Sequence, residues 1–412
     1  MIAVASRKRS TVRGGLGAPL RATAPRTQAA VQVAPPTEQA RPRLAELFVN
    51  HRAIASNVRH FRRVTGTQVM AVVKADAFGH GDVAEVALAN GATWIGVATI
   101  PEALRLRAAG IGAPMLSWLN PVDADWSAAI SQRADVAVSS LEQLYAVARA
   151  AARVGVRARI HLHLDVGMSR DGAPREMWSA LCVIAREFEL AECLTVVGIM
   201  GHLSSAETPE DTQNEVERQR FVNGVRVALR RGLAPSELHL AASAAALHRP
   251  DTRFTLARIG AGLFGIDPAG RESLAQALTL TAPVAQLRRV AAGVGVGYGH
   301  EHTTSRATTL AVLPLGYGDG LPRAAQHRAE VSIRGSRFPV VGRISMDQIV
   351  VDVGDAAIEL GDIAVLVGPG TRGEPTAGEW AAWAGTIEHE VLTRLGVRTS
   401  RVLRTADARW AR

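Results

Sequence analysis

Eight short β-rich runs alternate with helix-like stretches between about residue 43 and residue 281. The runs span residues 69–74, 93–99, 113–118, 134–140, 158–166, 195–203, 237–243 and 254–260. Most are separated by Ala/Leu/Arg-rich segments with helical spacing, and several of these segments end in glycine, which commonly terminates a helix. Strands that alternate with helices form parallel βαβ units, and eight units predict an α/β fold of the (β/α)8 TIM-like barrel type. A doubly wound sheet is the alternative, but that architecture has no reason to stop at eight strands.

The pattern changes after about residue 281. Short strands punctuated by Gly and Pro follow, as in "TTLAVLPLGYGDG" and "AEVSIRGSRFPVVGRI", with few helical stretches between them. This pattern predicts a separate, mostly β domain. The predicted organisation is a disordered basic N-terminal extension at 1–42, a barrel at 43–281 and a C-terminal β-rich domain at 282–412.

The net charge of +9 is concentrated in the N-terminal segment. Residues 1–43 hold eight Lys/Arg and one acid, whereas the remainder holds 39 basic and 37 acidic residues. A basic tail without apolar periodicity is typical of disorder, and targeting is the alternative interpretation. Because the rest of the chain is nearly neutral, we expect no nucleic-acid partner. No apolar run reaches the length of a membrane span, and Cys182 and Cys193 match no metal or redox spacing, so we expect a cytoplasmic protein with free thiols and no membrane association.

Polar residues stand at the ends of the predicted barrel strands, where barrel enzymes place their chemistry. Any one of them could simply satisfy buried backbone groups or lie in a solvated loop, but several together indicate a site. These residues are Lys74, Arg170, His202, Ser243, Arg258 and Gly260.

Lys74 follows the apolar run "VMAVV" and precedes a glycine-bearing turn. Burial disfavours the charged form of lysine, and a neutral amine can form a Schiff base with an aldehyde. Ser243 and the turn "RIGAG" follow the last two strands, where barrels commonly bind phosphate. A cofactor with both an aldehyde and a phosphate is pyridoxal 5'-phosphate (PLP), and Arg258 is placed to face its ring nitrogen.

The chain resembles the alanine racemase family over about residues 43–403. The blocks that carry the resemblance are "AVVKADAFGHG", "LDVGMSRDG", "GIMGH", "ARIGAGLFG", "VGVGYGHEHTT", "LPLGYGDGLPR", "VGRISMDQIVVDVG" and "EVLTRLGVR". Eight ordered blocks across both predicted domains are more specific than any single motif.

The resemblance implies a role for each matching residue. Lys74 holds PLP as a Schiff base and is the base on one face of the substrate, and Tyr298 from the partner subunit is the base on the other face. Arg258 hydrogen-bonds the pyridine nitrogen, His202 orients Arg258 or the tyrosine, and Arg170 lies near the cofactor oxygen and the substrate carboxylate. Ser243, Gly260 and Ala261 hold the phosphate, with Phe78 beside it, and Tyr317 and Met346 of the partner form the substrate entrance. The resemblance thus implies a homodimer with a shared active site.

Three positions depart from the family pattern. Phe78 stands where the family usually has tyrosine, so a hydroxyl near the phosphate is missing. His163 stands where many members have a lysine that orients the arginine, and Ala242 replaces the asparagine that commonly precedes the phosphate serine. None of these changes removes a catalytic group, but each could change cofactor binding or substrate range.

The predicted function is a racemase that interconverts L-alanine and D-alanine, the latter a peptidoglycan precursor. The alternatives are a racemase of the same fold acting on serine or on many amino acids, a barrel-fold PLP decarboxylase, and a PLP-binding homeostasis protein. A decarboxylase of that type would carry glutamate in place of Arg258, and homeostasis proteins resemble the barrel alone.

Two further patterns carry less weight. His161, His163 and Asp165 alternate at the strand period, so we expect no metal site there. The run "GVGVGYG" at 293–299 lacks the GxGxxG order of a dinucleotide-binding turn, and it is better interpreted as a loop that presents Tyr298.

Overall fold

The computed structural model describes residues 44–396 and 398–404 of the 412-residue chain. The extension predicted at residues 1–42 lies outside the described residues. No helix within the described ranges is long and apolar enough to cross a membrane.

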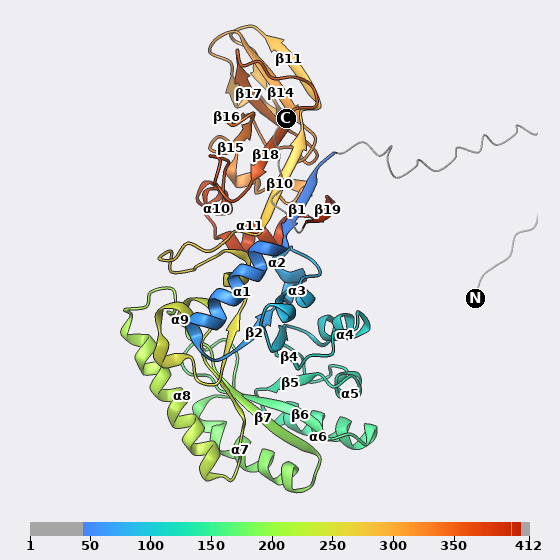
Figure 1. Ribbon diagram of the computed structural model, residues 1–412, viewed down its shortest axis with the longest axis vertical. Coiled ribbons are helices and arrows are strands. Elements are labelled where there is room, and N and C mark those ends of the chain that lie inside the picture. Colours follow the sequence, from blue (N-terminus) through green and yellow to red (C-terminus); the bar gives the residue numbers. More distant parts are fainter. Residues whose placement is uncertain (1–43, 397, 405–412) are drawn as a thin grey trace, which may run out of the picture. The chain divides into compact units, whose positions relative to one another are not determined.

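Eight parallel strands form one sheet, and each coincides with one of the eight predicted runs. Their spatial order is β8-β7-β6-β5-β4-β3-β2-β9, and a parallel bridge between Ala242 and Arg258 brings the β8 end of the sheet to β9. The predicted barrel is therefore confirmed (Figure 1). The strands are β2 (Gln68–Val72), β3 (Trp94–Val97), β4 (Met115–Ser117), β5 (Asp135–Val138), β6 (Ala158–His163), β7 (Leu194–Met200), β8 (Glu237–His239) and β9 (Leu256–Ile259).

Helices lie around the outside of the barrel strands (Figure 1). Local sequence sets their ends: the Asn50 side chain accepts hydrogen bonds from the first turn of α1, and the Ser140 side chain does the same for α6. Both helices end at a glycine with positive φ, Gly66 and Gly155. The helices are α1 (His51–Thr65), α3 (Ala84–Ala89), α4 (Ile100–Ala108), α5 (Trp126–Ser131), α6 (Leu141–Val154), α7 (Arg175–Leu190), α8 (Thr212–Arg230) and α9 (Ser243–His248).

A second, nine-stranded sheet makes up most of the rest of the described chain, which confirms the predicted mostly β domain. Its spatial order is β11-β14-β17-β16-β15-β18-β10-β1-β19. The strands are β1 (Glu46–Asn50), β10 (Leu278–Pro283), β11 (Gln286–Val290), β14 (Thr308–Leu313), β15 (Glu330–Ile333), β16 (Ser336–Val341), β17 (Ile349–Gly354), β18 (Ile363–Val367) and β19 (Ser400–Arg404). A hairpin of β12 (Gly295–Val296) and β13 (His302–Thr303) and the helices α10 (Ala377–Ala384) and α11 (Glu388–Arg394) accompany it.

One strand of this sheet comes from the segment that precedes the barrel. β1 pairs antiparallel with β10 and parallel with β19, and it was not among the predicted strands. The division of the chain at residues 42 and 281 stays a prediction. β1, at residues 46–50, falls within the range predicted for the barrel, yet it is a strand of the β-rich sheet.

Candidate active site

Lys74 opens a turn of unusual handedness at the carboxyl end of β2. The segment α2 (Lys74–Phe78) has φ values of 52, 53, 52 and 56° at residues 75–78. Left-handed backbone costs an L-residue about 1–2 kcal/mol, so surrounding contacts must hold this turn. The Ala75 N–H donates to Glu102 Oε1 at 2.8 Å, and the Ala77 N–H donates to the Val73 carbonyl at 2.9 Å.

The β-rich domain also holds the lysine turn. Asp76 forms an ion pair with Arg401 of β19 and lies 3.8 Å from Arg105 of α4. Helix α11 packs so closely that a Cβ at Gly79 would overlap the Leu392 carbonyl, and α2 and α11 are neighbours in Figure 1. Lys74 is therefore positioned by both the barrel and the elements α11 and β19.

The surroundings of Lys74 favour its neutral form. Burial lowers the pKa of the Lys74 ammonium, and the positive charges of Arg170 and Arg258 lower it further, while Glu102 opposes them. Its Nζ lies 5.8 Å from the centre of the Trp118 ring. A lysine with a lowered pKa holds a larger fraction of nucleophilic amine at neutral pH.

Arg258 of β9 is buried with almost all of its donors in use. Nη1 donates to the His239 carbonyl at 2.7 Å and to His239 Nδ1 at 3.1 Å. Nη2 donates to the carbonyls of Gly201 (2.7 Å) and Leu240 (3.2 Å) and to His202 Nδ1 (3.1 Å). Guanidinium has five N–H groups, and the Nε–H is the one that no described group accepts. Burial lowers the pKa of Arg258 to about 10, so it stays protonated at neutral pH and can donate to a ring nitrogen.

His202, two residues after the end of β7, acts as a neutral acceptor for Arg258. Burial lowers the pKa of His202 well below its usual value, and the charges of Arg258 and Arg170 add to this. Since Nδ1 accepts from Arg258, the ring proton resides on Nε2. The predicted pairing of His202 with Arg258 is therefore present in the structure.

Ser243, Gly260 and Ala261 lie together at the ends of β8 and β9. The buried Ser243 Oγ accepts from the N–H groups of Gly260 (3.2 Å) and Gly262 (3.1 Å), so its own proton is available to an external acceptor. Ala261 begins the short 3-10 helix η3 (Ala261–Phe264) between these two glycines. A Cβ at Gly260 would lie 3.2 Å from Cζ of Phe78. The backbone, the hydroxyl and the Phe78 ring thus form one cradle.

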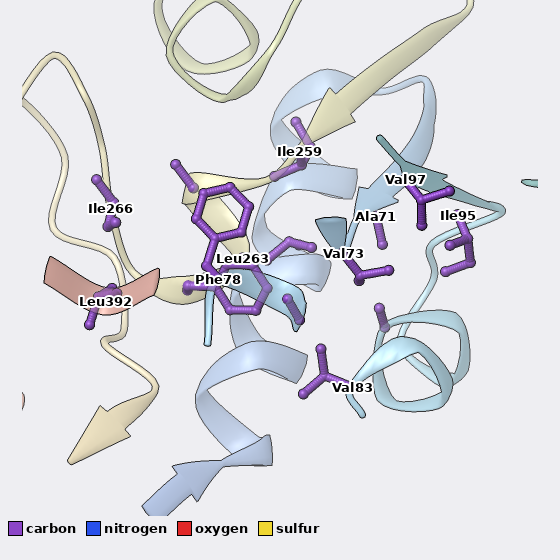
Figure 2. Close-up of a cluster of buried hydrophobic side chains, with 14 of the residues drawn as sticks. Ala71, Val73, Phe78, Val83, Ile95, Val97, Ile259, Leu263, Ile266 and Leu392 are labelled. Carbon is purple, nitrogen blue, oxygen red and sulfur yellow. The ribbon is translucent and has the colours of Figure 1, made fainter. Parts of the chain in front are cut away.

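Phe78 belongs to the apolar side of this cradle. Its ring lies 5.1 Å from the Phe264 ring, and Figure 2 shows it among Ile259, Leu263 and Leu392. The position that lacks the family hydroxyl is therefore packed as part of the core.

Arg170 lies in the loop after β6, exposed and without a hydrogen bond or ion pair to any residue that the structure describes. Among the described residues no hydrogen bond joins His163 to Arg170; His163 Nδ1 instead lies 3.5 Å from Asp171 Oδ2. Burial alone would raise the pKa of Asp171, but His163, the Gly172 N–H and the Ser139 hydroxyl lower it to about 2. His163 thus contacts a fixed carboxylate beside Arg170 in sequence.

Tyr298, Tyr317 and Met346 lie on the β-rich domain, and none of the interactions found for Lys74 among the described residues involves them. Their exposed fractions are 71%, 41% and 52%, high for large apolar side chains. The Tyr317 and Gly318 N–H groups bond to the carbonyls of Ser345 and Met346. A Cβ at Gly299, next to Tyr298, would contact Arg343. The three residues therefore come from adjoining loops of one surface.

Several residues of the site were not predicted from the sequence. Glu102 could have been, because "TIPE" is a capping-box pattern whose glutamate here also holds the lysine turn. His389 of α11 lies with its ring 5.9 Å from that of Phe78. Burial and the charge of Lys74 lower the pKa of His389, and Glu207 opposes them. Among residues 44–396 and 398–404, no group of three or more His, Cys, Asp or Glu side chains is arranged to hold a metal ion.

Comparison with known proteins identifies two matching family models. The alanine racemase N-terminal domain matches residues 49–268, and the alanine racemase C-terminal domain matches residues 277–403.

Known proteins match over nearly the whole described chain. An alanine racemase from Thermobifida fusca is 44% identical over 364 residues, which are 87% of this chain and 97% of the relative. The crystal structure of alanine racemase from Streptomyces lavendulae superposes with a TM-score of 0.86 at 38% identity, covering 88% of this chain and 98% of that one. The structure of alanine racemase from Bartonella henselae with covalently bound pyridoxal phosphate has a TM-score of 0.80 at 27% identity. The match covers 88% of this chain and 100% of that one. The chain belongs to the alanine racemase family.

Proposed function

We propose that the protein is a PLP-dependent alanine racemase that interconverts L-alanine and D-alanine. One observation carries the proposal most directly. Lys74, whose pKa is lowered, shares the mouth of the barrel with an arginine that has a single uncommitted N–H. Relatives named alanine racemase that match both domains support the choice of substrate. The product D-alanine would serve peptidoglycan synthesis.

The donor set of the site fits PLP. Lys74 offers an amine for the aldehyde, Arg258 Nε–H a donor for the ring nitrogen, and the Ser243 hydroxyl with the backbone at Gly260 and Ala261 a cradle for the phosphate. When bound, PLP would supply the electron-withdrawing system that makes the α-proton of the substrate acidic. Because Arg258 keeps its proton, it donates a hydrogen bond without transferring that proton. This favours return of a proton to the α-carbon over side reactions.

Inversion of the α-carbon needs an acid–base group on each face of the substrate. Lys74 would exchange the proton on one face, and Tyr298 of a second copy of the chain would exchange it on the other. Arg170 would bind the substrate carboxylate, with Tyr317 and Met346 of the second copy at the entrance. The exposure of Tyr298, Tyr317 and Met346 on one surface supports a homodimer whose subunits complete each other's sites.

The first experiment incubates the PLP-loaded protein with a panel of L-amino acids and follows the products by chiral chromatography. We expect D-alanine to form fastest. Faster conversion of serine would instead support the racemase of other or broad specificity.

Two variants test the roles of the residues. Lys74→Ala should lose the visible absorbance of bound PLP and all racemisation; absorbance that survives without added amine would contradict the role of Lys74. Tyr298→Phe should slow solvent deuterium incorporation from one enantiomer much more than from the other. Sedimentation tests the shared site, because a fully active monomer would refute it.

A further inference from the structure

A buried line of hydrogen bonds leads away from Arg258 into the barrel. Arg258 Nη1 contacts His239 Nδ1 at 3.1 Å, and His239 Nε2 contacts His161 Nδ1 at 2.8 Å. His161 Nε2 then lies 3.4 Å from Asp135 Oδ2. Both histidines are fully buried, and Asp135 is 1% exposed. No step of the proposed reaction uses any of these three side chains.

The line crosses the barrel from its catalytic end to its opposite end. His239 is the last residue of β8, at the end that carries the active site, whereas Asp135 is the first residue of β5. At the far end of the line, Arg159 donates two hydrogen bonds to Asp135, at 2.8 and 3.0 Å. The Arg159 side chain is half-exposed.

The proton positions along the line follow from one fixed end. Arg258 can only donate, so His239 Nδ1 must accept. Burial, His161 and Arg258 lower the pKa of His239 well below its usual value, so its ring is neutral and its single proton resides on Nε2. That proton is donated to His161 Nδ1, which leaves the His161 proton on Nε2, facing the Asp135 carboxylate.

The backbone also accommodates this pair of histidines. A Cβ at Gly198 of β7 would lie well inside van der Waals contact of His161 Nδ1 and 3.0 Å from the Glu237 carbonyl. The pairing of β6 with β7 shifts register at Ile160/His161. The neighbouring strand thus leaves room where the two rings meet.

We propose that Asp135 is a positioning residue for Arg258: it accepts the Nε2 proton of His161, which donation from Arg258 leaves at the far end of the line, and so helps to hold the guanidinium with Nε–H toward the cofactor ring. Without an acceptor at residue 135, His161 can place its proton on Nδ1, which faces the N–H of His239. His239 can then relieve the clash only by moving its own proton to Nδ1, toward Arg258. Loss of the acceptor at residue 135 therefore disturbs the hydrogen bond between His239 and Arg258, the residue that would contact the cofactor. The inference rests on the proposed function, because it concerns how Arg258 meets PLP.

The first test uses the protein without added cofactor, so it does not depend on racemase activity. Nitrogen-15 NMR of labelled histidines distinguishes protonated from unprotonated ring nitrogens, with signals assigned from His161→Gln and His239→Gln. We expect the proton on Nε2 of both rings. A proton on Nδ1 of either ring would overturn the proposal, and this measurement needs no variant at residue 135.

The second test separates the acceptor from the general integrity of the barrel base. Asp135→Leu removes the acceptor, Asp135→Asn retains a carbonyl oxygen, and Arg159→Leu is the matched control that leaves the carboxylate in place. In the PLP-loaded protein, Asp135→Leu should shift the absorbance of bound PLP and lower kcat about tenfold with KM nearly unchanged, as expected for partners that orient a ligand-binding group. Asp135→Asn and Arg159→Leu should both stay close to the parent protein in NMR and absorbance. Unchanged histidine signals and absorbance in Asp135→Leu, or the same changes in Arg159→Leu, would refute the positioning role.

Discussion

Phe78→Tyr should strengthen cofactor binding, because it adds a hydroxyl at the cradle of Ser243 and Gly260. The carbon that would carry the hydroxyl, Cζ, faces Gly260, which has no Cβ to obstruct it. A hydrogen bond to a charged group contributes about 1.5–3 kcal/mol, a net value that already includes the exchange with water. The lower end of this range, about 1.5 kcal/mol, corresponds to a roughly tenfold lower Kd for PLP.

The assay is a fluorescence titration of the cofactor-free protein with PLP, compared with thermal unfolding of the same sample. Before PLP is added, the variant should be no more stable than the parent, since its new hydroxyl lies in the apolar cluster of Phe264 and Leu263. Phe188→Tyr, in α7 and remote from the cradle, is the control and should leave the Kd unchanged. Unchanged or weaker PLP binding in Phe78→Tyr would show that Cζ does not face the phosphate.

Three further perturbations test the surroundings of the site. Ala75→Gly should leave the free energy of unfolding unchanged or raise it by up to about 1 kcal/mol, because φ is 52° at this residue. Its control, Ala152→Gly in α6, should lower the free energy of unfolding by about 0.5–1 kcal/mol. Urea unfolding measures both. Burial lowers the pKa of His80 to about 4, so the unfolded chain takes up a proton at this histidine at a higher pH than the folded chain does. The free energy of unfolding should therefore fall as the pH drops from about 6.5 to 4, by at most roughly 3 kcal/mol. His80→Asn should therefore lose less stability between pH 7 and 4.5, and an identical loss would exclude His80 as a source. Gly198→Ala should cost about 1–3 kcal/mol by overpacking against His161, while Gly112→Ala, with open space around it, should unfold at the parent temperature.

The barrel and the central part of its site could be predicted because they depend on local signals. Most of the eight strands are short, largely apolar runs bounded by helix or turn residues, and strands of a barrel end at a common face. Lys74, His202 and Ser243 lie at or after the ends of such runs and Arg258 lies near the end of its strand, so their proximity follows from the topology.

Features that depend on tertiary contacts could not be predicted in this way. Residues 75–78 contain no glycine, and their sequence gives no sign of a left-handed turn; Glu102, Asp76 with Arg401, and helix α11 hold it. The strand β1 has only five residues, and its partners are more than 200 residues away in the chain. His389 lies in a block that resembles the family, yet its place beside Phe78 depends on how α11 packs against α2.

The pairing of β1 with β19 has a consequence for the order of folding. Glu46 is opposite Ser400, so this contact closes a loop that includes the whole barrel, and contacts of such long range form slowly. During synthesis the barrel sequence is complete long before β19 leaves the ribosome. Arg401, which pairs with Asp76 of the lysine turn, is made together with β19. A nascent chain could therefore hold a formed barrel while its lysine turn still awaits the contacts that fix it, and competence to bind the cofactor would come only with the final residues of the sheet.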